Sequence, residues 1–255
     1  IIAIHMTSIS KISASTFLLV LVFIISSCQS SAQIGKFLEK AGQLAGNPTT
    51  TEITSGLKEA LEKGTGISSD RLSLENGYLG NLDVKILFPE EARQVERTLR
   101  NIGLGNLCDQ VITSLNRAAE DAANEAKPIF TDAIKQMSFQ DVQQILLGEN
   151  NAATQYFQRT TTNSLSEKFS PIIDNSLEKV EATKYWDDVM TRYNKVPLVK
   201  PVNTNLTAYV TEKAIQGLFI EIAKEELKIR EQVSARTSPL LQKVFGYAER
   251  EKSGQ

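Results

Sequence analysis

The chain has 255 residues, of which 41% are hydrophobic and 23% charged, a balance typical of globular domains rather than of disordered or membrane-spanning chains. Its net charge of −2 leaves no surplus of cations to neutralise phosphates, so nucleic acid is not an expected partner. The only histidine, His5, precedes an apolar segment that we expect to be removed, which excludes imidazole catalysis and imidazole zinc sites. Carboxylate, lysine or tyrosine chemistry and the binding of hard cations by oxygen ligands stay open, but we predict neither a metal site nor a cofactor.

An apolar run near the start of the chain predicts an export signal. Residues 17–25 are uninterruptedly apolar and follow the positive charge of Lys11, and we take Met6, the first methionine, as the expected start. The run is shorter than the roughly 20 residues that a membrane-spanning helix needs, but it matches the roughly 7–15 residues of a signal-peptide core. We interpret it as a targeting segment rather than as part of the fold.

The four residues Ile25–Cys28, with the sequence Ile-Ser-Ser-Cys, resemble a lipobox. The resemblance implies a lipidated Cys28 at the mature N-terminus, a membrane anchor through its acyl chains, and a place in the bacterial cell envelope facing the periplasm. Two or three acyl chains hold a protein at a membrane essentially permanently. The alternative is an ordinary signal peptide cleaved near Ala32.

Beyond residue 35, apolar residues recur at three- and four-residue spacing, which predicts an all-α fold with at most one short strand pair. Thr49 and Glu52 form a capping-box pattern at the start of a helix expected over 52–63, which Gly64 should end. The following stretch, 64–88, is interpreted as a long surface connection. Its residues 84–88 are the one strand candidate.

Pro89 suits the first turn of the next helix, which Gly103 should end. The buried face of that helix is expected to hold three residues: Val95, Leu99 and Ile102. A long stripe of apolar and small residues over 107–126 then predicts a helix that Pro128 breaks or kinks. Cys108 lies on this stripe and is interpreted as a small buried residue, with a reactive thiol as the alternative.

Ser138 and Asp141 form a second capping pattern, for a helix that closes at Gly148. Asn205 is the expected N-cap of the longest helix, and Ser238, followed by a proline, that of the last. Between them the pattern predicts three helices and an extended connection: 152–169, 171–180, 184–193 and 196–201.

No repeat and no shift of composition marks a second domain. The predicted organisation has four parts: a signal segment over 1–27 that is removed, a lipidated cysteine and tether over 28–34, a single helical domain over 35–246 and a polar tail over 247–255.

Two polar clusters are candidate ligand-binding sites. In the first, Gln155, Arg159 and Thr162 share one helix face and offer groups that suit a carboxylate or phosphate. The alternative is a partly buried Arg159 paired with Asp132 or Glu212. The second cluster combines aromatic and hydrogen-bonding residues over 185–188 and 193–195, which suits sugar or peptide stacking, although Trp186 is more typical of a core residue. The candidate ligand-binding residues are Gln155, Tyr156, Arg159, Thr160, Tyr193, Asn194 and Lys195.

A charge-dense stretch over 221–230 holds three glutamates among lysines and an arginine. Pairs three and four residues apart explain it as a solvated helix face.

Four sequence motifs occur in this order along the chain: KPIFTDAIKQMSF over 127–139, AATQYFQRTT over 152–161, YNKVPLV over 193–199 and YVTEKA over 209–214. Together they resemble the bacterial family catalogued as domain of unknown function 4197, over about 34–246. The resemblance implies an exported or lipid-anchored single domain. It implies no activity, so no catalytic residue is transferred.

We therefore expect a non-catalytic envelope protein that binds a partner protein or a small ligand near Tyr156, Arg159 and Tyr193. One alternative is a carboxylate-dependent hydrolase that acts on envelope material, and another is a purely structural lipoprotein with neither a catalytic cleft nor a binding pocket. The binding protein and the hydrolase differ in what a cleft should contain, because the hydrolase requires two carboxyl groups about 5–10 Å apart.

Overall fold

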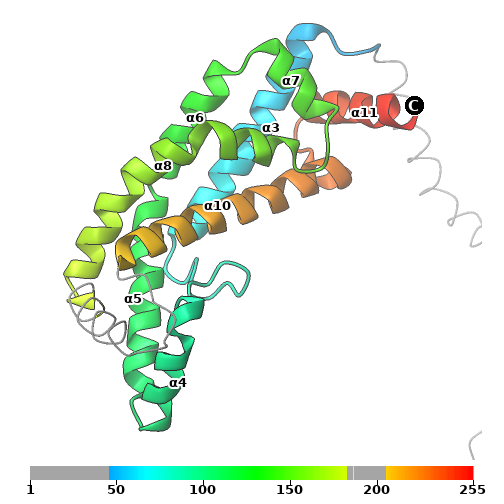
Figure 1. The fold of residues 1–255 in the computed structure, drawn as a ribbon. Helices are drawn as coiled ribbons and strands as arrows, with labels where there is room; N and C mark the ends of the chain where they lie inside the picture. The colour runs from blue at the N-terminus through cyan, green and yellow to red at the C-terminus, as the bar shows by residue number, and fades with distance from the viewer. Residues whose placement is uncertain (1–45, 183–185, 187–204, 255) are drawn as a thin grey trace, which may run out of the picture. The chain divides into compact units, whose positions relative to one another are not determined.

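A computed structural model describes residues 46–182, 186 and 205–254 (Figure 1). Contacts divide the chain into residues 1–47 and 48–255, and every element below belongs to the second unit. In the described residues, this unit contains eight α-helices, two short 3-10 helices and no strand: α3 (Thr50–Ser73), η2 (Glu90–Ala92), α4 (Arg93–Asn101), α5 (Gly105–Ala123), α6 (Ala126–Gln136), α7 (Phe139–Leu146), α8 (Ala152–Glu178), α10 (Leu206–Glu231), η3 (Val233–Ala235) and α11 (Pro239–Ser253). The expected all-α fold is confirmed.

The core lies where α3, α5, α8 and α10 pack against one another, with α6 and α11 against α3 (Figure 1). Phe130 of α6 is central, because its ring lies 5.1 Å from that of Phe157 and 6.3 Å from that of Phe219, both edge to face. Such aromatic pairs add roughly 0.5–1.5 kcal/mol beyond the burial of their area.

Among the described residues, no helix is long and apolar enough to cross a bilayer.

Four helix starts that were predicted from capping residues are confirmed. Thr49 and Glu52 form a reciprocal capping box, and Ser138 forms the same box with Asp141. The side chains of Asn205 and Ser238 each accept a backbone N–H three residues on. These caps depend only on residues within one turn, which is why the sequence predicts them.

Gly64 does not end the first helix, as predicted, because α3 continues to Ser73. Gly64 is buried where α3 packs on α10, and a Cβ added to it would lie 3.7 Å from the Cβ of Glu225. The next two turns bury Ser68 and Leu72. These tertiary contacts outweigh the roughly 1 kcal/mol that glycine costs inside a helix.

The segment 74–88 is not the surface connection that was predicted, since Tyr78, Val84, Ile86 and Phe88 are buried. The Tyr78 hydroxyl donates to the Ala214 carbonyl of α10 at 2.7 Å, and its backbone N–H donates to the Glu120 carboxylate at 3.0 Å. The segment is therefore held between α5 and α10.

The strand candidate over 84–88 is also wrong. Ile86 is fixed by the side chain of Asn116 on α5, whose Oδ1 accepts the Ile86 N–H at 2.8 Å and whose Nδ2 donates to the Ile86 carbonyl at 2.7 Å. One amide side chain thus satisfies the two backbone groups that a neighbouring strand would otherwise pair.

Two predictions about buried faces also need correction. The 3-10 turn η2 precedes α4, and no residue of α4 is buried, although Val95 and Leu99 pack partly against the core. Ile102 is 66% exposed, and Leu107 of α5 is 48% exposed. The buried part of α5 begins at Cys108, which is fully buried as predicted.

Prolines have less effect on the helices than predicted. The break between α5 and α6 lies at residues 124–125, so Pro128 falls in the first turn of α6, where proline is tolerated. Pro171 lies inside a continuous α8 that replaces the two helices predicted over 152–169 and 171–180. Pro171 and Glu167 are both exposed, so water can satisfy the Glu167 carbonyl that loses its partner.

At the end of the described chain, α11 extends to Ser253, through most of the segment predicted as a polar tail. The predicted helix over 184–193, except Trp186, and the extended connection over 196–201 lie outside the described residues.

Candidate functional site

The predicted ligand-binding residues of α8 lie on neighbouring turns of that helix. Tyr156 is buried, and its hydroxyl donates to the Ala133 carbonyl at 3.2 Å. The Thr160 hydroxyl donates to the carbonyl of Tyr156 at 2.9 Å, and the Gln155 amide to Asn151 at 3.0 Å. Three of the groups that were expected to meet a ligand thus form hydrogen bonds within the protein.

Arg159 is exposed, and its guanidinium lies over the Tyr156 ring, 5.7 Å from the centroid. The alternative pairing with Asp132 or Glu212 is wrong, because Asp132 pairs with Lys135 and Glu212 accepts from Gln216. The other predicted residues, Tyr193, Asn194 and Lys195, lie outside the described residues, as does Cys28.

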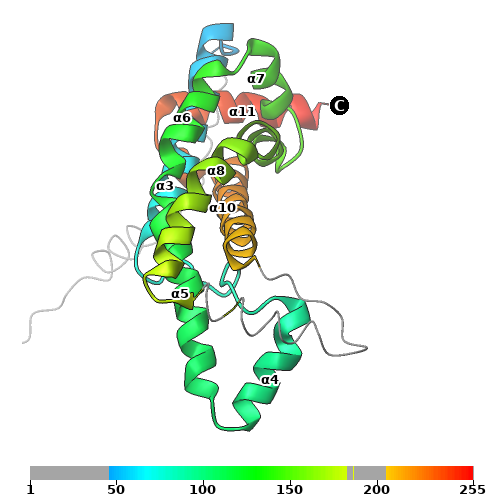
Figure 2. The same ribbon diagram turned by 60° about the vertical axis from the view of Figure 1, so that its left-hand side comes forward.

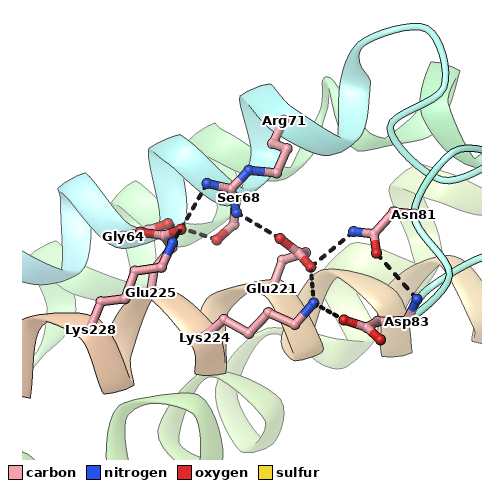
Figure 3. A network of polar contacts seen from close by, with 9 residues as sticks. All are labelled: Gly64, Ser68, Arg71, Asn81, Asp83, Glu221, Lys224, Glu225 and Lys228. Carbon is pink, nitrogen blue, oxygen red and sulfur yellow. Dashed lines mark hydrogen bonds and ion pairs between the residues drawn. The ribbon is translucent and has the colours of Figure 1, made fainter. Parts of the chain in front are cut away.

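A charged network that the sequence did not predict joins α3 to α10 (Figure 3). Arg71 of α3 bridges two glutamates one turn apart on α10. Its Nη1 lies 2.7 Å from Glu221 Oε2, and its Nη2 lies 2.8 Å from Glu225 Oε1. Both carboxylates are nearly fully buried, whereas the Arg71 side chain is 40% exposed. We use the name Glu221–Glu225 network for the set of Arg71, Asn81, Asp83, Glu221, Lys224, Glu225 and Lys228.

The same network holds the loop before α4. Glu221 accepts from the Asn81 amide at 3.1 Å and pairs with Lys224 at 2.6 Å. Lys224 also reaches Asp83 at 2.5 Å, and Lys228 pairs with Glu225 at 2.7 Å (Figure 3). Every carboxylate of the network therefore has a cationic partner.

These contacts decide the chemistry that the two glutamates can perform. Burial raises the pKa of Glu221, but hydrogen bonds from the surrounding cations and amide outweigh it, and the pKa lies below its usual value. Burial acts on Glu225 in the same direction, and its bonds to Lys228 and Arg71 again leave the pKa lowered. A general acid needs a raised pKa. Both groups are instead held as carboxylates with a structural role.

A second buried cluster surrounds Glu226, which accepts the backbone N–H groups of Ala153 and Thr154 at the start of α8. Arg230 pairs with Glu226 at 2.8 Å and donates to the carbonyl of Ile145 at the end of α7. One ion pair of α10 thus satisfies helix ends of both α7 and α8.

The interpretation of residues 221–230 as a solvated face is therefore wrong for its glutamates. Glu221, Glu225 and Glu226 are 1, 6 and 9% exposed. The charge pattern alone did not reveal this, because the partners Arg71, Asn81 and Ala153 are distant in the sequence.

An apolar groove of about 820 Å³ lies between α4, α5 and three residues beyond α8: Val180, Ala182 and Trp186. We call it the α4–α5 groove. The described residues that line it are Phe88, Val95, Leu99, Leu107, Cys108, Asp109, Gln110, Val111, Thr113, Ser114, Val180, Ala182 and Trp186.

The lining of the groove includes aromatic and polar side chains as well as aliphatic ones. Trp186 is 6% exposed and packs against Phe88, with ring centroids 5.7 Å apart, so its interpretation as a core residue is confirmed. Asp109, Thr113 and Ser114 of α5 also line the groove, although Asp109 pairs with Arg100 and both hydroxyls donate to carbonyls of their own helix. The thiol of Cys108 is buried, and this desolvation raises its pKa, which disfavours the reactive thiolate.

Among the residues that the structure describes, no group of three histidine, cysteine, aspartate or glutamate side chains is placed to hold a metal ion. The described site therefore consists of an apolar hollow and two structural charge clusters.

Comparison with known proteins gives one match. The family described as "Protein of unknown function (DUF4197)" matches residues 47–246. This match begins later than the range of about 34–246 that the sequence motifs suggested, and it ends at the same residue. No curated protein and no solved structure matches the chain.

Proposed function

Because the chain belongs to the DUF4197 family, which assigns no activity, we propose a function from the groove and the sequence: an envelope lipoprotein that binds an apolar ligand without converting it. In this proposal, acyl chains on Cys28 hold the protein at a bacterial membrane, and the helical domain faces the periplasm. The domain acts there as a binding protein rather than as an enzyme.

The observation that supports binding is the α4–α5 groove. Its volume of about 820 Å³ lies within the roughly 300–1,000 Å³ of small-molecule sites. Leu99 and Val111 offer partly buried apolar surface, and Asp109 and Thr113 add polar groups to the lining. This arrangement suits a molecule with an acyl chain and a polar end, the chain lying against the apolar wall.

A partner protein on α8 remains a second proposal. The exposed guanidinium of Arg159 supports it, because this cation forms no ion pair with any residue that the structure describes and is stacked on Tyr156. Such a group can pair with a carboxylate of a partner.

The alternative of a carboxylate-dependent hydrolase gains no support from the two buried carboxylates that Arg71 bridges. Glu221 and Glu225 share one guanidinium, and both have lowered pKa values. A hydrolase of this class needs one carboxyl group that stays protonated near neutral pH.

Trp186, the only tryptophan of the chain, lines the groove and serves as a reporter. We expect dodecanoate to change its fluorescence saturably. Leu99→Ser should weaken this binding about tenfold, because it removes a partly buried apolar contact. Leu227→Ser is the control, since Leu227 is 39% exposed on α10 outside the groove. A flat titration of the parent chain, or equal affinities of the two variants, contradicts the proposal.

A further inference from the structure

The turn between α4 and α5 exposes three large apolar side chains within six residues. Ile102, Leu104 and Leu107 keep 66, 42 and 48% of their surface exposed. Figures 1 and 2 both show α4 and the first turns of α5 extending beyond the other described helices. We call residues 102–107 the hairpin tip. Its apolar surface lies at a projecting end of the described unit.

The turn itself keeps these side chains outward. Gly103 has φ +87°, a conformation that suits glycine, and a Cβ added there would meet open space. The backbone N–H of Leu104 donates to the Leu99 carbonyl at 2.9 Å, which closes the end of α4. Ile102 and Leu104 therefore flank a tight turn that is fixed by backbone bonds rather than by burial of their side chains.

One cation behind the hairpin tip lacks a counter-charge. Of the three arginines of α4, Arg93 pairs with Glu90, and Arg100 pairs with Glu96 and Asp109. Arg97 is exposed and forms no ion pair with any described residue. An uncompensated cation thus lies one turn behind the apolar residues.

We propose that the hairpin tip docks on an anionic phospholipid surface. Ile102, Leu104 and Leu107 enter the boundary between headgroups and acyl chains, and Arg97 meets the lipid phosphates. Interfacial apolar groups lie roughly 5–10 Å deep, and a cation near an anionic surface adds to the attraction. A projecting tip of three side chains offers much less than the roughly 800 Å² per partner that a stable protein interface buries.

This inference goes beyond ligand binding, and it does not require acylation of Cys28. Leu107 belongs both to the hairpin tip and to the lining of the α4–α5 groove. Docking would therefore bring the groove next to the membrane.

The first test uses residues 46–255, which leave out the apolar run over 17–25 that binds lipid by itself. All the described core lies between Ile53 and Ala248, within the unit 48–255, and circular dichroism checks the fold of each variant. We expect this fragment to sediment with vesicles of phosphatidylcholine and phosphatidylglycerol. The triple variant Ile102→Ser, Leu104→Ser and Leu107→Ser should partition about tenfold less.

The matched control removes three apolar side chains elsewhere. Leu74, Leu82 and Val233 are 65, 88 and 61% exposed, so replacing all three by serine removes at least as much exposed apolar surface. We expect this control to bind as the parent does. Arg97→Gln should reduce binding to the anionic vesicles and leave the weaker binding to pure phosphatidylcholine unchanged. Equal partitioning of the tip variant and the control overturns the proposal.

A second test uses the full chain in membranes and does not depend on how the fragment folds. An environment-sensitive fluorophore on Leu104→Cys should emit at shorter wavelength than the same fluorophore on Leu82→Cys, after subtraction of the parent's labelling. Identical emission from both positions contradicts docking. Ligand binding measured through Trp186 is separate, so either proposal can fail while the other holds.

Discussion

Glu226 of α10 and Thr154 of α8 are joined by two hydrogen bonds to a single carboxylate oxygen, from the Thr154 backbone N–H at 2.9 Å and from its hydroxyl at 2.8 Å. The start of α8 carries no cap of its own, since the side chain of Asn151 makes no capping bond. A side chain 72 residues away therefore does what a local N-cap does elsewhere in the chain.

This relationship predicts that Glu226→Gln lowers the free energy of unfolding by about 3 kcal/mol, because it leaves the buried Arg230 without its counter-charge. Denaturant unfolding measures the loss. Glu231→Gln is the control: it lies five residues on in the same helix, is exposed, and should change stability by less than about 0.5 kcal/mol. Equal losses in both variants contradict the assigned role of Glu226.

The Glu221–Glu225 network predicts how stability depends on pH. Because the folded chain holds both pKa values below the usual value of 4.5, the network stabilises it fully above that pH and loses this contribution as the pH falls through the folded values. Arg71→Gln should reduce stability at pH 7 by about 1 kcal/mol, since Arg71 is partly exposed.

The same variant should also flatten the fall in stability below pH 4.5, because it raises both folded pKa values towards the unfolded ones. Unfolding measured at pH 7 and pH 3 tests this. Arg97→Gln serves as the matched control, because Arg97 has no ion pair among the described residues. Unchanged pH dependence in Arg71→Gln is the contradicting result.

The sequence predicts features that depend on neighbouring residues better than features that depend on contacts between segments far apart in the chain. The caps at Thr49 and Ser138 follow from residues within one turn, and these predictions were confirmed. The end at Gly64 and the strand at 84–88 depend on contacts with α10 and Asn116, and these predictions were wrong.

The candidate site also depends on contacts between distant parts of the chain. The α4–α5 groove is assembled from residues as far apart as Phe88, Val111 and Trp186, so periodicity in any one helix did not reveal it. The sequence did show one apolar residue of the groove, Leu107, at the start of the stripe over 107–126. In the structure Leu107 is 48% exposed and lines the groove. Gln155, Arg159 and Thr162 were predicted to share one helix face, and all three are exposed on consecutive turns of α8.

Two helical glycines predict opposite effects of the same substitution. A Cβ on Gly217 of α10 would lie 2.7 Å from Cε1 of the buried Tyr78, whereas a Cβ on Gly66 of α3 would meet nothing within 4 Å. Gly217→Ala should therefore destabilise the chain by about 1–3 kcal/mol through overpacking. Gly66→Ala should stabilise it by about 0.5–1 kcal/mol through helix propensity. Thermal unfolding compares them, and a shift of the same sign in both contradicts the close packing of Tyr78 on α10.

The lipid anchor is tested by the two cysteines of the chain. Cys28 follows the lipobox-like residues, whereas Cys108 is fully buried between α4 and α5 and has a pKa raised by burial, so it is a poor acceptor for an acyl group. We expect cells that express the chain to incorporate labelled palmitate into it, Cys28→Ala to lose this label and Cys108→Ala to keep it. Because two or more acyl chains hold a protein at a membrane, Cys28→Ala should also move from the membrane fraction to the soluble fraction unless its signal segment is retained. Equal labelling of Cys28→Ala and the parent chain rules out acylation at Cys28.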